Sequence, residues 1–160
     1  MRQIKLANPG GLENLNLVTA DKPSPKSDQI LIKVSASSLN FHDLLVALGN
    51  IPTADGRVVL SDCAGEVVEV GSGVNDWSVG DKVMSCCYPH WRSGEPRYDL
   101  LSFIGDNEDG YSTEYMAISE KSVTAMPKGW SMKEAATLPC AGLTAVSYTH
   151  LRAHETLQHR

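Results

Sequence analysis

The sequence lacks several features that mark secreted, membrane and nucleic-acid-binding proteins. None of its four cysteines occurs in a CxxC pair, no run reaches 18 apolar residues, and the opening residues MRQIKLANPG contain no apolar signal-peptide segment. The sequence has 14 lysines and arginines and 19 acidic residues, so the net charge is −5. It contains no cluster of basic residues that could bind the phosphates of a nucleic acid. We therefore expect a cytoplasmic chain with free thiols that binds neither nucleic acid nor a membrane.

The composition is that of a globular domain built mainly from β-strands. Hydrophobic residues make up 42% of the 160 residues and charged residues 21%, and this length allows one domain and the beginning of a second. Short runs rich in β-branched and aromatic residues predict strands at residues 2–6, 15–19, 29–36, 58–71, 82–87, 111–119 and 122–126. Many short strands at this spacing are typical of a β-barrel or a sandwich.

Two short helices interrupt the β pattern. The first is expected over residues 41–49, because Asn40 is a good N-cap and Asp43 stands at the third helical position. The second is expected after Ser131, which opens a capping box, and Pro139 is expected to end it. The fold class predicted from the sequence is therefore mainly β with short helices.

The last fifteen residues differ in composition from the rest of the chain. The stretch VSYTHLRAHET, at residues 146–156, resembles the translation of a common transposase-type sequencing adapter, so we interpret residues 146–160 as an artefactual tail without functional histidines. The alternative is a genuine short C-terminal helix with surface histidines. DNA reads that cross codon 145 without amplification would decide between them.

Four motifs in order carry a resemblance to a known family. The segments SLNFHDLLVALG, GRVVLSDCAGEVVEVGSGVNDWSVGDKV, DGYSTEYMAI and EAATLPCAGLTA together resemble the zinc-independent branch of the medium-chain dehydrogenase/reductases, the quinone-oxidoreductase-like and alcohol-dehydrogenase-like proteins. The resemblance covers residues 1–145. It implies a GroES-like catalytic β-barrel at residues 1–127 and, at residues 128–145, a link and first helix toward a nucleotide-binding domain.

The second domain that the resemblance implies is a Rossmann domain, which binds NADP or NAD in the cleft between the two domains. No GxGxxG motif occurs in this chain, so the turn that cradles the cofactor's pyrophosphate cannot be built from it. The sequence is therefore interpreted as a truncated fragment that lacks the Rossmann domain and is itself inactive, and the intact parent is expected to be a homodimer.

The resemblance also bears on metal binding. At the positions where zinc-dependent relatives hold their catalytic ion, this sequence has Asn40, Asp62 and Cys140. An amide, a carboxylate and one thiolate make a poor ligand set for zinc. The four closely spaced cysteines of the structural zinc site are represented only by the pair Cys86–Cys87. We expect no metal.

Without a Lewis acid, alkoxide formation from an alcohol is poorly supported, so we expect hydride transfer to an already electrophilic carbon in a quinone, an enone or a related carbonyl compound. Asn40 and His42 are the catalytic candidates. The resemblance adds Phe41, Cys140 and Thr144, together with Asn40 and His42, as cofactor-binding residues. Their structural alternatives are an N-cap, exposed helix residues and a buried inert thiol.

Two residues are candidates for the substrate pocket. Asp62 stands near the expected cleft, although a buried carboxylate needs partners that the sequence does not identify. Trp91 lies in the long polar loop between residues 88 and 110 and could form a wall of an apolar pocket, or simply anchor the loop.

Two other functions remain open at this point. The chain could be a stand-alone GroES-like barrel that acts as a non-enzymatic binding module, or a zinc-type alcohol dehydrogenase with degenerate ligands. A downstream strand followed by GxGxxG would argue against the first, and metal analysis would decide the second.

Overall fold

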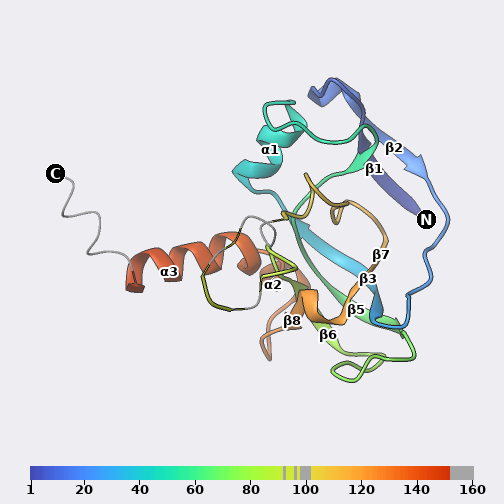
Figure 1. The fold of residues 1–160 in the computed structure, drawn as a ribbon, viewed down its shortest axis with the longest axis vertical. Coiled ribbons are helices and arrows are strands. Elements are labelled where there is room, and N and C mark those ends of the chain that lie inside the picture. Colours follow the sequence, from blue (N-terminus) through green and yellow to red (C-terminus); the bar gives the residue numbers. More distant parts are fainter. Residues whose placement is uncertain (92, 96, 98–101, 152–160) are drawn as a thin grey trace.

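The computed structural model describes residues 1–91, 93–95, 97 and 102–151, and its β-strands form two sheets (Figure 1). The smaller sheet has the order β2-β1-β4 and the larger β7-β3-β5-β6-β8, with antiparallel pairing throughout. The strands are β1 (Arg2–Leu6), β2 (Leu15–Thr19), β3 (Gln29–Ser38), β4 (Arg57–Val58), β5 (Asp62–Val70), β6 (Lys82–Ser85), β7 (Tyr115–Ser119) and β8 (Val123–Ala125). The prediction of a mainly β fold with short helices is confirmed.

The larger sheet curls into a barrel because its two edge strands are neighbours in the chain. Only the short 3-10 turn η3 (Glu120–Ser122) separates β7 from β8, and a backbone bond from Cys86 N–H to Ser122 C=O ties the end of β6 to it. Irregular register between β3 and β5 helps the strands bend. The interior is filled by alternate residues of these strands and by Ile104 and Tyr111.

The predicted strand over residues 58–71 is wrong as a single element. The chain pairs with β1 through β4 and then with β3 through β5, so it changes sheets between Val58 and Asp62. Leu60 makes the change with a φ of +77°, a conformation that a leucine rarely adopts. Hydrogen bonds from Tyr111 N–H to Leu60 C=O and from Ser112 N–H to Val59 C=O hold this corner.

The first helix is close to its prediction. Helix α1 (Phe41–Ala47) begins after the N-cap Asn40, and the Asp43 carboxylate accepts a 2.8 Å hydrogen bond from the Asn40 backbone N–H. Gly49 follows with a φ of +78°, and a Cβ there would lie 2.4 Å from the Pro9 carbonyl oxygen, while a Cβ at Gly10 would lie 2.5 Å from the Gly49 Cα. Helix α1 is thus held beside the start of β5, where the Asn40 side chain bonds Asp62, and its Val46 packs against Leu6 of β1.

The prediction that Pro139 ends the second helix is wrong. Helix α2 (Met132–Ala135) ends earlier, and Pro139 lies in the first turn of a π-helical segment, η4 (Leu138–Gly142). Proline is tolerated there because the first N–H groups of a helical segment have no partner within it. The segment leads directly into helix α3 (Leu143–Leu151).

Helix α3 projects away from the barrel (Figure 1). The boundary at residue 145 falls inside it, and Val146 and Tyr148 are exposed. Residues 152–160, with His154 and His159, lie outside the described residues, so the interpretation of residues 146–160 as a tail stays a prediction. Among the described residues, no helix is both long and apolar enough to span a membrane.

One buried polar atom in the core leads to a testable prediction. The Tyr111 side chain is 1% exposed, and its hydroxyl has no hydrogen-bond partner among the described residues. An unpaired buried hydroxyl costs free energy, so Tyr111→Phe is expected to stabilise the barrel by about 1 kcal/mol. Urea unfolding of the 160-residue chain measures this.

The matched control for Tyr111→Phe is Tyr115→Phe on β7, where the side chain is half-buried and the Lys22 ammonium lies 4.9 Å from the ring centroid. This change is expected to leave the free energy of unfolding within about 0.5 kcal/mol of the wild type. A loss of stability in Tyr111→Phe would contradict the absence of a partner for the hydroxyl.

Candidate functional site

A buried carboxylate gathers three distant segments at one end of the barrel. Asp62, the first residue of β5, is fully buried. Its Oδ2 accepts hydrogen bonds from Asn40 Nδ2 at 3.0 Å, from the Cys140 backbone N–H at 3.2 Å and from Ser38 Oγ at 3.3 Å. The three residues that the resemblance aligned with a zinc site, Asn40, Asp62 and Cys140, are therefore neighbours in the structure.

The same contacts set the pKa of Asp62 and use both amide hydrogens of Asn40. Burial raises the pKa of Asp62, and the nearby Asp43 carboxylate raises it further, while the hydrogen bonds from Asn40, Cys140 and Ser38 oppose the rise. Asn40 Nδ2 also bonds Ser61 Oγ at 3.1 Å, so both amide hydrogens have partners. Asn40 thus caps α1 with its backbone and holds Asp62 with its side chain.

Two thiols lie beside the carboxylate. The Cys87 thiol donates to Asp62 Oδ1 over 4.0 Å and is hydrogen-bonded to the Cys140 thiol. Burial, followed by the charge of Asp62, raises the pKa of both thiols. Their un-ionised state near neutral pH makes them poor nucleophiles and poor metal ligands.

This donor set does not suit a zinc ion. One Asn40 amide hydrogen and the Cys140 backbone N–H point to Asp62, and the other Asn40 amide hydrogen points to Ser61. Asp62 Oδ2 already accepts three hydrogen bonds. Across the described part of the chain, no group of three histidine, cysteine, aspartate or glutamate side chains is arranged to hold a metal.

A second cluster joins α1 to the long loop. His42 Nε2 lies 3.0 Å from Asp106 Oδ2, and the Asp106 side chain is only 8% exposed. The His42 ring packs on Phe103 with 4.2 Å between ring centroids, and Phe103 meets the edge of Tyr88 at 5.2 Å. The contacts therefore run from the histidine–aspartate pair through Phe103 to Tyr88.

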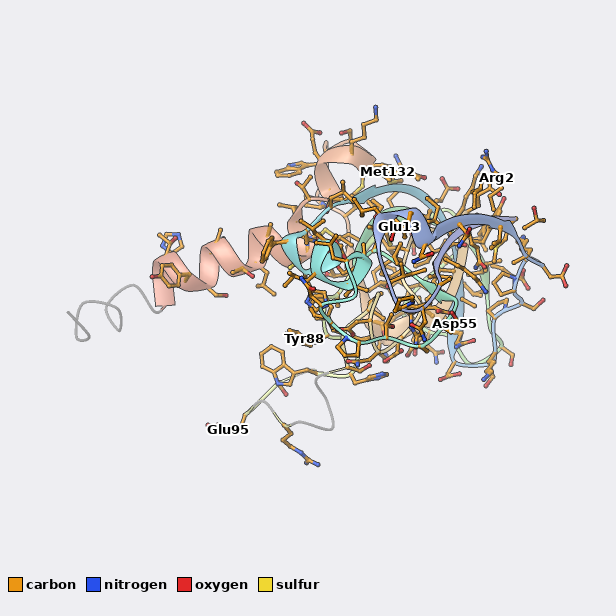
Figure 2. All side chains as sticks on the ribbon, turned by 90° about the horizontal axis from the view of Figure 1, so that it is seen from above. Arg2, Glu13, Asp55, Tyr88, Glu95 and Met132 are labelled. Carbon is orange, nitrogen blue, oxygen red and sulfur yellow. The ribbon has the colours of Figure 1, made fainter. Side chains whose placement is uncertain are left out.

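Tyr88 is part of the lining of an apolar cavity of about 510 Å³. The cavity lies between the end of β6, the start of the long loop and the segment formed by η4 and α3. It is lined by Met84, Ser85, Cys86, Cys87, Tyr88, Trp91, Thr124, Leu138, Pro139, Gly142, Leu143 and Val146. Eleven of these residues precede the boundary at residue 145, and Val146 belongs to the segment interpreted as a tail. Figure 2 shows Tyr88 where the loop that carries Glu95 leaves the barrel, on the side from which α3 projects.

The structure distributes the predicted site residues over three places. Trp91 lines the cavity, and its role in a substrate pocket stays a prediction. Asn40, Asp62 and Cys140 form the polar cluster, which Cys87 connects to the cavity. His42 belongs to the histidine–aspartate pair. Phe41 is 74% exposed and Thr144 is exposed on α3 between two lining residues, and neither contacts the cavity lining in a described interaction.

Sequence reasoning missed four residues of this region. Tyr88, Phe103 and Asp106 lie in the long loop, where no periodicity places a side chain, and Cys87 was interpreted only as an inert thiol. The loop contained one usable signal, since its aromatic residues are too apolar for a solvated segment. The distance of 64 residues between His42 and Asp106 gave no signal at all.

Comparisons with known proteins agree with this fold. Residues 26–128 match the family model of the alcohol dehydrogenase GroES-like domain. The chloroplast envelope quinone oxidoreductase homolog of Arabidopsis thaliana is 36% identical over 141 residues, which are 86% of this chain and 38% of that protein. The acryloyl-coenzyme A reductase of Metallosphaera sedula is 34% identical over 139 residues, 81% of this chain and 41% of that protein.

A solved structure gives the same result in three dimensions. The putative alcohol dehydrogenase of Sinorhizobium meliloti 1021 superposes with a TM-score of 0.82 at 29% identity, over 96% of this chain and 48% of that one. The chain belongs to the alcohol dehydrogenase GroES-like domain family of the medium-chain dehydrogenase/reductases, and the predicted GroES-like barrel is confirmed. It spans less than half the length of these relatives, which are oxidoreductases.

Proposed function

We propose that the parent protein is a zinc-independent oxidoreductase that uses NADPH or NADH to reduce quinones, enones or related carbonyl compounds. The observation that carries the proposal is the adjacency of an apolar cavity of about 510 Å³ to the polar cluster of Asn40, Asp62 and Cys140, whose donor set does not suit zinc. A cavity lined mainly by apolar side chains favours small, uncharged substrates. The similarity to a quinone oxidoreductase homolog and to an acryloyl-coenzyme A reductase points to the same chemistry.

The residues of this chain fit only one end of a nicotinamide cofactor. Asn40, Phe41, His42, Cys140 and Thr144 are the proposed contacts for the nicotinamide end, and no Gly-rich turn for the pyrophosphate occurs in the sequence. When bound, the cofactor would supply the hydride. This chain's part is to bind the substrate, exclude water from it and stabilise the charge that develops on its oxygen.

His42 is proposed to relay the proton that the reduced substrate takes up. Its Nε2 is paired with Asp106, which orients the ring. Asp106 is in turn held by its neighbours, because Thr53 Oγ1 donates to the Asp106 backbone carbonyl and the Asn107 backbone N–H donates to the Asp106 carboxylate. We further propose a reducing, cytoplasmic location, consistent with four cysteines that form no disulfide in the described part of the chain, and a homodimeric parent.

The experiment is an assay of the complete gene product, cloned after sequencing the source DNA through codon 145. We expect oxidation of NADPH or NADH that depends on a quinone such as menadione or on an enone such as cyclohexenone, with less than 0.1 zinc per chain by elemental analysis. The 160-residue chain is the control and is expected to show no turnover. Alcohol oxidation with one zinc per chain would indicate a zinc alcohol dehydrogenase. Absence of both nucleotide binding and turnover would indicate a binding module.

A further inference from the structure

We propose that Tyr88 is the catalytic hydrogen-bond donor of this site, with its phenol O–H directed at the carbonyl oxygen of the substrate in the 510 Å³ cavity. The proposal rests on the proposed function and assigns a residue within it. When hydride adds to the electrophilic carbon of an enone or quinone, the displaced electron pair moves to the carbonyl oxygen. That oxygen then accepts a stronger hydrogen bond from the phenol, and a proton that comes from solvent, with His42 as the proposed relay, neutralises it before release.

Packing against Phe103 holds the Tyr88 ring in place. Phe103, which is 9% exposed, meets the Tyr88 ring edge-on at an interplanar angle of 75°, and the His42 ring packs on Phe103 in turn. Tyr88 itself is 38% exposed and lines the cavity. A donor held by packing rather than by its own hydroxyl keeps that hydroxyl available for a ligand, which is what preorganised stabilisation of an oxyanion requires.

The surroundings keep the phenol protonated. Burial raises the pKa of Tyr88, and the neighbouring Cys87, Cys140 and Asp106 raise it further. The phenol is therefore a neutral donor across the physiological pH range.

Three other donors near the cavity have partners already. Both amide hydrogens of Asn40 go to Ser61 and Asp62, and His42 Nε2 faces Asp106. Trp91 Nε1 donates to the Gly94 carbonyl. Tyr115 on β7 carries the same phenol but is not part of the cavity lining, and it therefore provides a matched control.

The first test compares Tyr88→Phe with Tyr115→Phe in the complete gene product. Removing one oxyanion donor lowers kcat by about 10²-fold in enzymes that depend on it, and we expect that loss in Tyr88→Phe with KM raised by about fivefold at most. Tyr115→Phe is expected to keep kcat within about twofold. A kcat of Tyr88→Phe within twofold of an active wild type would overturn the assignment, whereas an inactive wild type would overturn the proposed function instead.

A second test needs no turnover and uses the 160-residue chain. Menadione binding is followed by quenching of Trp91 fluorescence, with Trp91→Phe identifying the signal. Loss of one neutral hydrogen bond of about 1 kcal/mol corresponds to roughly a fivefold weaker Kd, which is expected for Tyr88→Phe and not for Tyr115→Phe. Equal affinity of Tyr88→Phe and the wild type would contradict a hydrogen bond from Tyr88 to the carbonyl.

Discussion

Replacing Gly71 with alanine is expected to destabilise the barrel by about 3 kcal/mol, at the upper end of ordinary single substitutions. A Cβ at Gly71 would lie 1.9 Å from the Lys26 carbonyl oxygen and 2.6 Å from the Ser27 carbonyl oxygen. Both atoms belong to backbone, which cannot rotate away as a flexible side chain could. The end of β5 would have to separate from the segment that leads into β3.

The separation would break the contacts that join these two strands at their ends. Gly71 N–H donates to the Gln29 carbonyl and Gly73 N–H to the Ser27 carbonyl, both at 2.8 Å. Because β3 and β5 share the longest pairing in the larger sheet, loosening their end affects the whole barrel. A glycine is required at position 71 because there is no space for a side chain, and not because of the backbone conformation, since its φ is not positive.

Gly73→Ala is the matched control, two residues away in the same turn. Its Cβ would approach the Ser27 carbonyl oxygen to 3.1 Å, a contact that a shift of a few tenths of an ångström relieves. We expect a loss of about 1 kcal/mol or less, measured with Gly71→Ala by urea unfolding of the 160-residue chain. Equal losses in the two variants would contradict the steric argument.

Replacing Asp62 with alanine is expected to cost about 2 to 4 kcal/mol at pH 7, because it leaves several buried donors without an acceptor. Asn40 Nδ2, the Cys140 backbone N–H and Ser38 Oγ all donate to one carboxylate oxygen. Loss of that oxygen also frees the contact between η4 and β5. Menadione binding should weaken along with stability, because η4 contributes to the cavity lining.

Asp62→Asn separates the hydrogen bonds from the charge. An amide oxygen can accept the same three donors, and the variant carries no buried negative charge. The pKa of Asp62 is raised in the folded state above its usual 3.8, so the carboxyl contributes most to stability below pH 3.8 and loses that contribution as the pH rises through the folded-state pKa. The stability of Asp62→Asn relative to the wild type should therefore increase from pH 3.5 to pH 7.

Urea unfolding at several pH values measures this difference, with Asp62→Ala included at each pH. Asp21→Asn serves as the control, because Asp21 is exposed. A decrease of the Asp62→Asn stability relative to the wild type over the same pH range would mean that the fold lowers the pKa of Asp62, and would contradict the burial argument.

Local sequence patterns were sufficient to predict those elements whose conformation depends on interactions between residues a few positions apart. The N-cap Asn40 with Asp43 predicted the start of α1, and Ser131 with Glu134 predicted the start of α2, because a capping box involves only residues three apart. Alternating apolar residues predicted most strands. Leu60 and Pro139 contradicted local expectation, since pairing with two different sheets and packing of the η4 segment decided their conformations.

For the candidate site, the sequence supplied residue types and the tertiary structure supplied their neighbours. The sequence by itself determined a mainly β barrel, an acidic surface charge and the family motifs that contain Asn40, Asp62 and Cys140. Only the folded chain decided that Asp62 is fully buried and that Tyr88 faces a cavity formed with η4 and α3. Burial and contact between residues up to 78 positions apart depend on how the strands close, which no local pattern encodes.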